Sequence, residues 1–308
     1  MPGRLKPRLV FIVGPTAVGK TRLAVKLARR INGEIISADS MQVYRGMRIL
    51  SQAPARKELS GIRYHLVSMF DVSKEYNVNI FRSKATKTIK DILKRRKIPV
   101  VVGGSGLYVK ALIDGLFPSP AAEIGFRARM QRFIGRYGSI KAHEKLSRID
   151  PDAAASIHPN DSRRIIRALE IYHSTGKTMT ELKSSTKGLK DEFSIKIFGL
   201  IRKRGAMYRD IENRVDDMFA GGIVNEVRRL SGKKMSKTSE AALGVKEVLG
   251  YLNQEYCADK TAELLKMNTR RLAKRQLTWF RADKRIKWID LDRTSEGNAI
   301  RIMAKEAR

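Results

Sequence analysis

With 308 residues, 42% of them hydrophobic, the chain can bury a full core and is typical of a globular rather than a disordered protein. Its 63 Lys and Arg against 31 Asp and Glu give a formal net charge of +32, which predicts a polyanionic partner, nucleic acid first and anionic membrane second. One cysteine, Cys257, excludes an intramolecular disulfide and is typical of a reducing compartment. No stretch is long enough to span a membrane, so we expect a cytoplasmic protein without a membrane partner.

The first predicted elements are a strand over residues 9–13, a glycine loop and a helix over 22–28. The loop has the spacing G-x-x-x-x-G-K-[ST], whose backbone N–H groups and helix N-terminus form a cradle for phosphate. Lys20 adds a cation, and the Thr21 hydroxyl is the usual Mg²⁺ ligand. The pattern leaves open which phosphate compound binds. The predicted phosphate-binding residues are Gly14, Pro15, Thr16, Ala17, Val18, Gly19, Lys20 and Thr21.

Two further strands are predicted along the next hundred residues. Gly33 is expected to cap the first helix at its C-terminal end, before a short buried strand over 34–38. Helical spacing of apolar residues predicts a helix over 78–97, and 98–102 has the continuous apolar character of a buried parallel strand. Together with the first strand, these segments predict an α/β fold with a parallel sheet.

The loops after these three strands should open into one crevice, because ligands bind at the carboxyl ends of parallel strands. Asp39 begins the second loop and Ser105 lies in the third, within Gly-Gly-Ser-Gly. Asp39 could anchor Mg²⁺ or a ribose, as in a kinase, or act as a general base. Ser105 could be a turn residue or a hydrogen-bond donor to a phosphate oxygen. The residues alone leave both choices open.

The pattern changes after residue 118. From 119 to 192 we predict an all-helical insertion, with surface helices at 122–137 and 139–148 and no strand. A further helix over 162–173 starts after Asp161 and carries Arg163, Arg164 and Arg167. The predicted domains are therefore a core, made of residues 1–118 and 193–308, and the helical insertion 119–192.

The chain then returns to the core with a strand over 193–201 and is expected to be helical from there on, apart from a polar linker over 231–239. The last long helix, 260–283, has Leu265, Leu272 and Trp279 at heptad spacing, expected to face the core. Its remaining charges are nearly all of one sign, which predicts contact with a nucleic-acid backbone. These residues are Lys266, Arg270, Arg271, Lys274, Arg275 and Arg281.

Five ordered motifs between residues 8 and 290 resemble the tRNA dimethylallyltransferases, also called tRNA isopentenyltransferases. In combination they are highly specific. They are Gly14–Thr21, Asp39-Ser40-Met41-Gln42-Val43-Tyr44, Val102-Gly103-Gly104-Ser105-Gly106-Leu107-Tyr108, His158-Pro159-Asn160-Asp161-Ser162-Arg163-Arg164, and Lys274-Arg275-Gln276-Leu277-Thr278-Trp279-Phe280-Arg281.

The resemblance implies a P-loop NTPase-like core with a helical tRNA-binding insertion. It implies transfer of a dimethylallyl group from dimethylallyl diphosphate to N6 of the adenosine 3′-adjacent to the anticodon, position 37 of tRNA, with release of diphosphate. The first loop, although similar to an ATP site, would hold the donor diphosphate together with Arg214 and Mg²⁺, which Thr21 would bind. We expect the enzyme to be a monomer that grips the anticodon stem-loop.

By the same resemblance, Asp39 is the general base for the N6 proton, and Ser105 and Lys20 complete the catalytic set. Ser105 stands where the family usually has Thr, and it keeps the hydroxyl. Val245 replaces the tyrosine of the usual Gly-Tyr-Lys-Glu. The residues expected to contact tRNA, including two from the basic C-terminal helix, are Asp39, Ser40, Met41, Gln42, Ser105, Arg127, Arg163, Arg164, Ile165, Ile166, Arg167, Lys274 and Arg275.

Three alternatives use the same motifs differently. A nucleotide or small-molecule kinase would explain the glycine loop and Asp39 but would give the basic helices no role. A prenyltransferase acting on free adenine nucleotides would not need an extended basic surface. A non-catalytic RNA-binding protein would tolerate loss of Lys20, Asp39 and Ser105, and all three are present.

Overall fold

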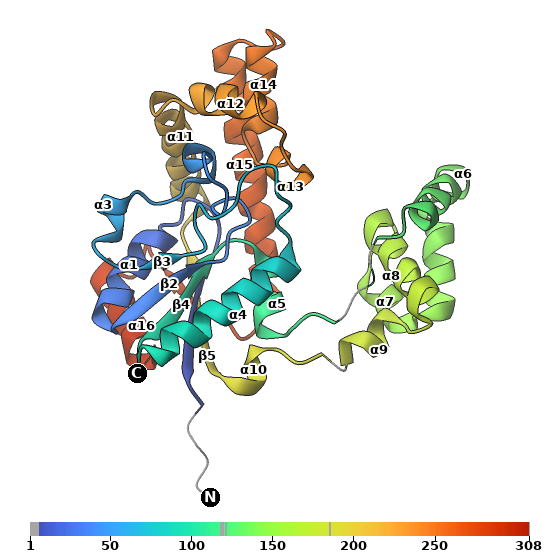
Figure 1. Ribbon diagram of the computed structural model, residues 1–308, viewed down its shortest axis with the longest axis horizontal. Helices are drawn as coiled ribbons and strands as arrows, with labels where there is room; N and C mark the ends of the chain where they lie inside the picture. The colour runs from blue at the N-terminus through green and yellow to red at the C-terminus, as the bar shows by residue number, and fades with distance from the viewer. Residues whose placement is uncertain (1–5, 118–119, 121, 185, 308) are drawn as a thin grey trace, which may run out of the picture. The chain divides into compact units, whose positions relative to one another are not determined.

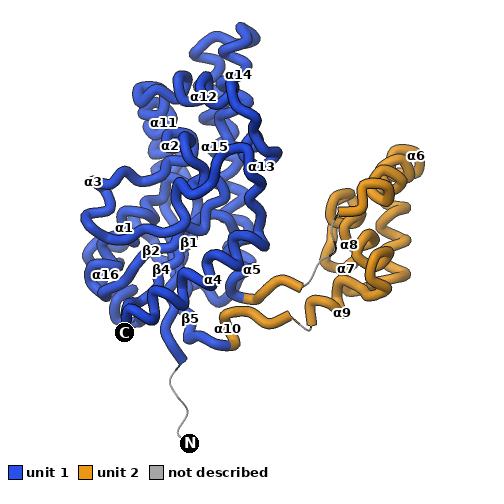
Figure 2. Tube along the Cα trace, in the orientation of Figure 1, with its two compact units in different colours: residues 1–113, 192–308 blue, residues 114–191 orange. Residues whose placement is uncertain are grey.

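The computed structural model describes residues 6–117, 120, 122–184 and 186–307. These fall into two compact units, residues 1–113 with 192–308 and residues 114–191 (Figure 2). The domain boundary predicted at 118–119 lies outside the described residues, and the second unit begins a few residues earlier, at Asp114. A tRNA-binding role for the insertion stays a prediction.

The first unit is built on a six-stranded sheet in the order β3-β2-β4-β1-β5-β6, and every neighbouring pair is parallel (Figure 1). β1 lies at the centre, where Ile12 is in register with Val102 of β4 and with Phe198 of β5. The strands are β1 (Arg8–Val13), β2 (Gly33–Ser37), β3 (Tyr64–His65), β4 (Ile98–Gly103), β5 (Ser194–Ile201) and β6 (Lys287–Asp290).

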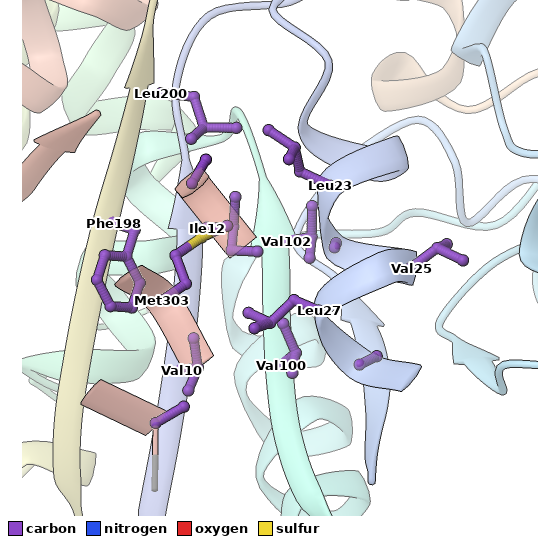
Figure 3. Close-up of a cluster of buried hydrophobic side chains, with 14 of the residues drawn as sticks. Val10, Ile12, Leu23, Val25, Leu27, Val100, Val102, Phe198, Leu200 and Met303 are labelled. Atoms are coloured by element: carbon purple, nitrogen blue, oxygen red, sulfur yellow. The ribbon is translucent and has the colours of Figure 1, made fainter. Parts of the chain in front are cut away.

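Alternate side chains of the sheet build the core. Val10 and Ile12 of β1 pack with Leu23 and Leu27 of α1 (Lys20–Arg30) and with Met303 of α16 (Glu296–Ala307) on one face (Figure 3). All five are almost completely buried, and each contributes about 2 kcal/mol through loss of apolar surface from water. This packing fixes the ends of the strands, and therefore the loops that follow them.

Helices flank the sheet, and none within the described ranges has both the length and the apolarity that crossing a bilayer requires. α4 packs on β4 and β2, and α11 packs along α15 (Figure 1). The helices of this unit are α1 (Lys20–Arg30), α2 (Arg48–Ser51), α3 (Arg56–Leu59), α4 (Val78–Lys94), α5 (Gly106–Ile113), α11 (Arg204–Ala220), α12 (Ile223–Ser231), α13 (Lys237–Glu240), α14 (Val245–Leu252), α15 (Ala258–Arg281) and α16 (Glu296–Ala307), with α10 (Leu189–Glu192) at its border.

Two expectations about local structure are wrong. Gly33 does not cap α1, because the helix already ends at Arg30 and the left-handed conformation falls on Asn32, with φ of 52°. Gly33 instead begins β2, where a side chain would come within 2.8 Å of the Ile98 carbonyl oxygen. The region after residue 201 is also not entirely helical, because β6 pairs with β5 at the edge of the sheet.

The C-terminal region differs from its prediction in two further places. The segment expected to be a polar linker contains α13, and Ser236 and Ser239 are buried there because they cap this short turn through each other's backbone N–H. On α15, Leu265 faces the core as expected, but Trp279 is 38% exposed. The residues at heptad spacing are therefore buried at Leu265 but reach the surface at Trp279.

The second unit is helical in its described residues, and Figure 1 labels its helices α6 to α9. The two predicted surface helices are both present within α6, and Gly138, with φ of 83° and ψ of 160°, separates them. They are not merely superficial, because Ala142 and Leu146 pack with Ile165 in the core of the unit. The helices are α6 (Ile124–Ile149), α7 (Pro151–Ser156), α8 (Ser162–Thr175) and α9 (Met179–Ser184).

Candidate active site

The glycine loop between β1 and α1 adopts a closed conformation. Gly14 has φ of 144° and lies so close to β5 that a Cβ would come within 2.6 Å of the Leu200 carbonyl oxygen. Gly19, with φ of 88°, lets the chain turn into α1. The Lys20 ammonium group donates to the Pro15 carbonyl oxygen at 2.6 Å and so reaches back across the loop. The backbone of the loop therefore curls round a central space with the Lys20 ammonium group beside it. A phosphate cradle requires this arrangement.

Two basic side chains, Lys20 and Arg214, lie beside this loop and are partly buried. Burial and repulsion from Arg214 lower the pKa of Lys20 to about 7, although attraction to Asp39 opposes the shift. Burial also lowers the pKa of Arg214, to about 10, against the same attraction to Asp39. A guanidinium N–H of Arg214 donates to the Thr16 hydroxyl at 3.2 Å. Two closely spaced, partly buried cations repel each other, so an anion placed between them is favoured.

Asp39 is fixed by the backbone that follows it. Its Oδ1 accepts hydrogen bonds from the N–H of Met41 at 2.8 Å and of Gln42 at 3.3 Å, which is the geometry of an Asx turn. Gln42 is itself held by the Ser37 hydroxyl, which donates to Oε1 at 2.8 Å. The carboxylate therefore has a defined direction at the end of β2, as a general base needs.

Ser105 lies where β4 passes into α5. Its carbonyl oxygen accepts the N–H of Tyr108 and Val109, which starts the helix. The loop approaches its neighbour closely, since a Cβ on Gly103 would come within 2.2 Å of the Ala38 carbonyl oxygen. The chain segments that follow β2 and β4 are thus in contact.

A cavity of about 1040 Å³ connects these parts. Val18 and Gly14 lie beneath it rather than on its wall, and Val18 is 2% exposed. Residues from both ends of the chain line this cavity, so the predicted crevice is formed. The predicted site residues on its wall are Thr16, Ala17, Gly19, Lys20, Thr21, Asp39, Ser40, Met41, Gln42, Ser105, Arg214 and Arg275.

Several lining residues had no role in the sequence interpretation. Tyr64 lines the cavity beside Thr21, and burial raises the pKa of its hydroxyl. Gln276 of α15 also lines it and accepts a hydrogen bond from the Thr16 N–H at 2.8 Å. Gln276 belongs to a motif that the resemblance includes, but no spacing rule shows that a side chain 260 residues away meets the glycine loop.

The basic face of α15 is less uniform than its sequence indicates. Lys266 pairs with Asp216 at 2.6 Å, and Arg270 with Glu212 at 2.8 Å, both across the contact with α11. These two cations are therefore partly neutralised and help to dock the helix. Lys274 and Arg275 remain exposed and available to a polyanion.

The arginines predicted to contact tRNA in the second unit divide into two kinds. Arg127 donates to the fully buried Glu170 at 2.8 and 2.9 Å, and Arg167 pairs with the same carboxylate. Burial raises the pKa of Glu170, but the hydrogen bonds from these arginines outweigh it and lower the pKa to about 2. Arg163 and Arg164 are exposed on α8.

Ile165 and Ile166 need correction as tRNA-contacting residues. Their side chains are 0% and 7% exposed, because they form the inner face of α8. A direct side-chain contact with RNA is not available in this conformation. They hold the helix so that its opposite face, with the arginines, points to solvent.

The described residues offer few protein ligands for a metal ion. No group of three or more His, Cys, Asp and Glu side chains suited to a metal ion occurs among the described residues. Thr21 and Asp39 line the same cavity, and Mg²⁺ usually combines one or two protein ligands with phosphate oxygens and water. The donor set therefore fits an ion that arrives with a phosphate ligand.

Comparison with known proteins identifies the family to which the chain belongs. The family model described as IPP transferase matches residues 42–283. A tRNA dimethylallyltransferase of Halothermothrix orenii is 45% identical over 286 residues, covering 92% of this chain and 87% of that protein. The chain belongs to the IPP transferase family.

Solved structures of IPP transferases agree with the fold. The crystal structure of the full-length tRNA isopentenylpyrophosphate transferase from Bacillus halodurans matches with a TM-score of 0.73 at 40% identity, covering 98% of this chain and 96% of that one. A eukaryotic dimethylallyltransferase captured acting on tRNA matches with a TM-score of 0.78 at 31% identity, over 96% and 78% of the two chains. The predicted fold class is confirmed.

Proposed function

We propose that this IPP transferase moves a dimethylallyl group from dimethylallyl diphosphate to N6 of adenosine 37, next to the anticodon of tRNA. The observation that carries the proposal is the single cavity lined by the cations Lys20 and Arg214 and by the carboxylate of Asp39. Such a cavity suits an anionic leaving group and a proton acceptor together. The names of the relatives at 40–45% identity supply the substrate class.

In the proposed reaction the bond between the allylic carbon and the diphosphate oxygen breaks as the bond from N6 to that carbon forms. The electron pair of the broken bond leaves with diphosphate, where Lys20 and Arg214 stabilise the charge. The proton lost from N6 passes to the Asp39 carboxylate, whose direction is set by the N–H of Met41. Ser105 lines the cavity after β4, from where its hydroxyl can donate to a diphosphate oxygen. Mg²⁺, held by Thr21 and the diphosphate, would supply further charge neutralisation.

The acceptor adenine has to leave the RNA stack to reach such a cavity, as bases generally do for enzymes that modify them. Lys274 and Arg275 of α15, with Arg163 and Arg164 of α8, would hold the anticodon stem-loop by its phosphates. We propose further that the enzyme acts as a monomer, since Lys20, Asp39 and Arg214 already line one cavity within a single copy of the chain.

The test is incubation with Mg²⁺, dimethylallyl diphosphate and unmodified tRNA, followed by mass spectrometry of the nucleosides. We expect prenylated adenosine in tRNA and none when AMP replaces tRNA. Product on AMP would move the protein to the adenylate prenyltransferases. ATP turnover without any prenyl transfer would overturn the proposal in favour of a kinase.

A further inference from the structure

The side chain of Gln276 joins the two loops that carry the proposed donor chemistry. It extends from α15, and its Oε1 accepts the N–H of Thr16 in the glycine loop at 2.8 Å. The other end of the same amide lies over the loop after β4, where a Cβ on Gly104 would come within 2.4 Å of Nε2. Gly104 immediately precedes Ser105, so one side chain spans from the phosphate cradle to the serine loop.

Thr16 is held from a second direction as well. Arg214 of α11 donates to its hydroxyl at 3.2 Å, while Gln276 of α15 accepts its backbone N–H. The two helices are in turn tied to each other by the Lys266–Asp216 and Arg270–Glu212 pairs. Thr16 is therefore the point at which the paired helices fix the rim of the cradle.

The hydrogen bond from Thr16 to Gln276 also decides which backbone N–H groups of the glycine loop can bind a phosphate. The Thr16 N–H is directed to Gln276, so it cannot at the same time point to a phosphate oxygen. Loss of the glutamine would leave this partly buried N–H without its partner and free the loop to turn. A phosphate cradle depends on donors that are already in place before the anion arrives.

We propose that Gln276 is a positioning residue, which sets the glycine loop and the Ser105 loop at the spacing that the diphosphate donor requires. The inference rests on the proposed function, in which the loop 14–21 binds that diphosphate. Gln276 acts through Thr16 and Gly104. Its two neighbours toward the N-terminus, Lys274 and Arg275, are exposed, so the helix that would bind RNA also holds the donor loop.

The experiment uses the full chain with Gln276→Met, which keeps the length of the side chain but removes the hydrogen bond. Gln276→Asn is a second variant, whose amide is one methylene too short to reach Thr16. Gln254→Met makes the same chemical change at an exposed residue and is the matched control. For each, the measurements are the KM for dimethylallyl diphosphate, the inhibition constant of inorganic pyrophosphate, and the dissociation constant for tRNA.

We expect both variants at 276 to raise the donor KM and the pyrophosphate inhibition constant in parallel, by about tenfold, as loss of one partly buried hydrogen bond implies. The dissociation constant for tRNA should stay within about twofold, and Gln254→Met should match the wild type. Hydrogen exchange should increase in the peptides covering 14–21 and 103–106 and return to wild-type values when pyrophosphate is added.

Two results would overturn the inference. Unchanged pyrophosphate inhibition would show that the cradle does not depend on Gln276. Equal losses of pyrophosphate and tRNA binding, with faster exchange along the whole of α15, would show only a packing role. A failure of the proposed function looks different, because then the wild-type protein itself would bind no pyrophosphate and transfer no prenyl group.

Discussion

A guanidinium N–H of Arg214 donates to the hydroxyl of Thr16 at 3.2 Å, although 198 residues separate them along the chain. The contact brings α11 to the glycine loop and places a second cation beside Lys20. Ordinary P-loops obtain their charge mainly from the loop lysine and a metal ion. Here the charge on the diphosphate would be shared with a helix from the other end of the sequence.

Arg214→Lys should therefore raise the KM for dimethylallyl diphosphate by about 10- to 100-fold, because lysine keeps the charge but lacks the planar donor pair. The dissociation constant for tRNA should hardly change. Arg209→Ala, at an exposed position of the same helix, is the control and should be neutral. An unchanged donor KM in Arg214→Lys would remove this arginine from the diphosphate site.

Asp39→Asn should reduce kcat by about 10²- to 10⁴-fold, the usual contribution of a general base. The amide oxygen can still accept the N–H of Met41, so the Asx turn and the binding of both substrates should survive. Asp71→Asn is a matched control, because Asp71 makes the same turn with Ser73 on the exposed surface. Retention of most activity in Asp39→Asn at saturating substrates would exclude Asp39 as the base.

Donor affinity should depend on pH through Lys20. In the free protein burial and Arg214 lower the pKa of this lysine to about 7, and a bound diphosphate would raise it again. Above pH 7 binding must therefore take up a proton, and the affinity should fall by up to tenfold for each pH unit. The KM for the donor from pH 7 to 9 tests this expectation, and Lys20→Met should abolish the dependence. A flat wild-type profile would contradict it.

Glu34 of β2, next to the edge strand β3, makes a pH-dependent contribution to stability. Burial raises the pKa of Glu34, but hydrogen bonds from Arg95, His65 and Lys97 outweigh it and lower the pKa from 4.5 to about 2. A lowered pKa means that the ionised form stabilises the fold above pH 4.5, and that this contribution, about 3 kcal/mol, is lost as the pH falls toward 2.

Glu34→Gln should accordingly lower the free energy of unfolding by about 2 kcal/mol at pH 7, and the difference from wild type should shrink as the pH falls. Urea unfolding at several pH values measures it. Glu255→Gln, at an exposed position, is the control. A difference that stays constant between pH 7 and pH 3 would show that the ionised carboxylate of Glu34 is not what stabilises the fold here.

In the second unit, Arg163→Ala should weaken tRNA binding by a few fold. It should also reduce the slope of the logarithm of the binding constant against the logarithm of salt concentration by about one, as removal of a phosphate contact does. Pyrophosphate inhibition should be unaffected. Arg127→Ala should instead lower the thermal stability of this unit, because it leaves the buried Glu170 short of a partner. Equal effects of the two substitutions on stability would contradict this division of roles.

Much of the fold follows from local patterns. The buried strands β1 and β4 have continuous apolar runs, and the order of strand, glycine loop and helix predicts where the crevice opens. The exact position of a turn is harder to predict, because neighbouring residues compete for the same conformation. Asn32 rather than Gly33 takes the left-handed conformation after α1, and Gly33 begins β2. β6 was missed because it is short and is stabilised by its pairing with β5.

The site was predictable to the same extent. Asp39, Lys20 and Ser105 follow strand ends, so topology alone brings them together. Gln276 and the Lys266–Asp216 pair depend on how α15 docks, which no periodicity in the helix reveals. The burial of Ile165 and Ile166 could have been inferred from helical spacing, since they lie between arginines on the inner face of α8.

The close approach of α15 to the first residue of α5 has a genetic consequence. A Cβ on Gly106 would come within 2.2 Å of the Trp279 ring, so α5 and α15 can pack this closely only because residue 106 has no side chain. Gly106→Ala should be harmful alone and suppressed by a smaller residue at 279. Among descendants of this gene, the two codons would then change together or remain as they are.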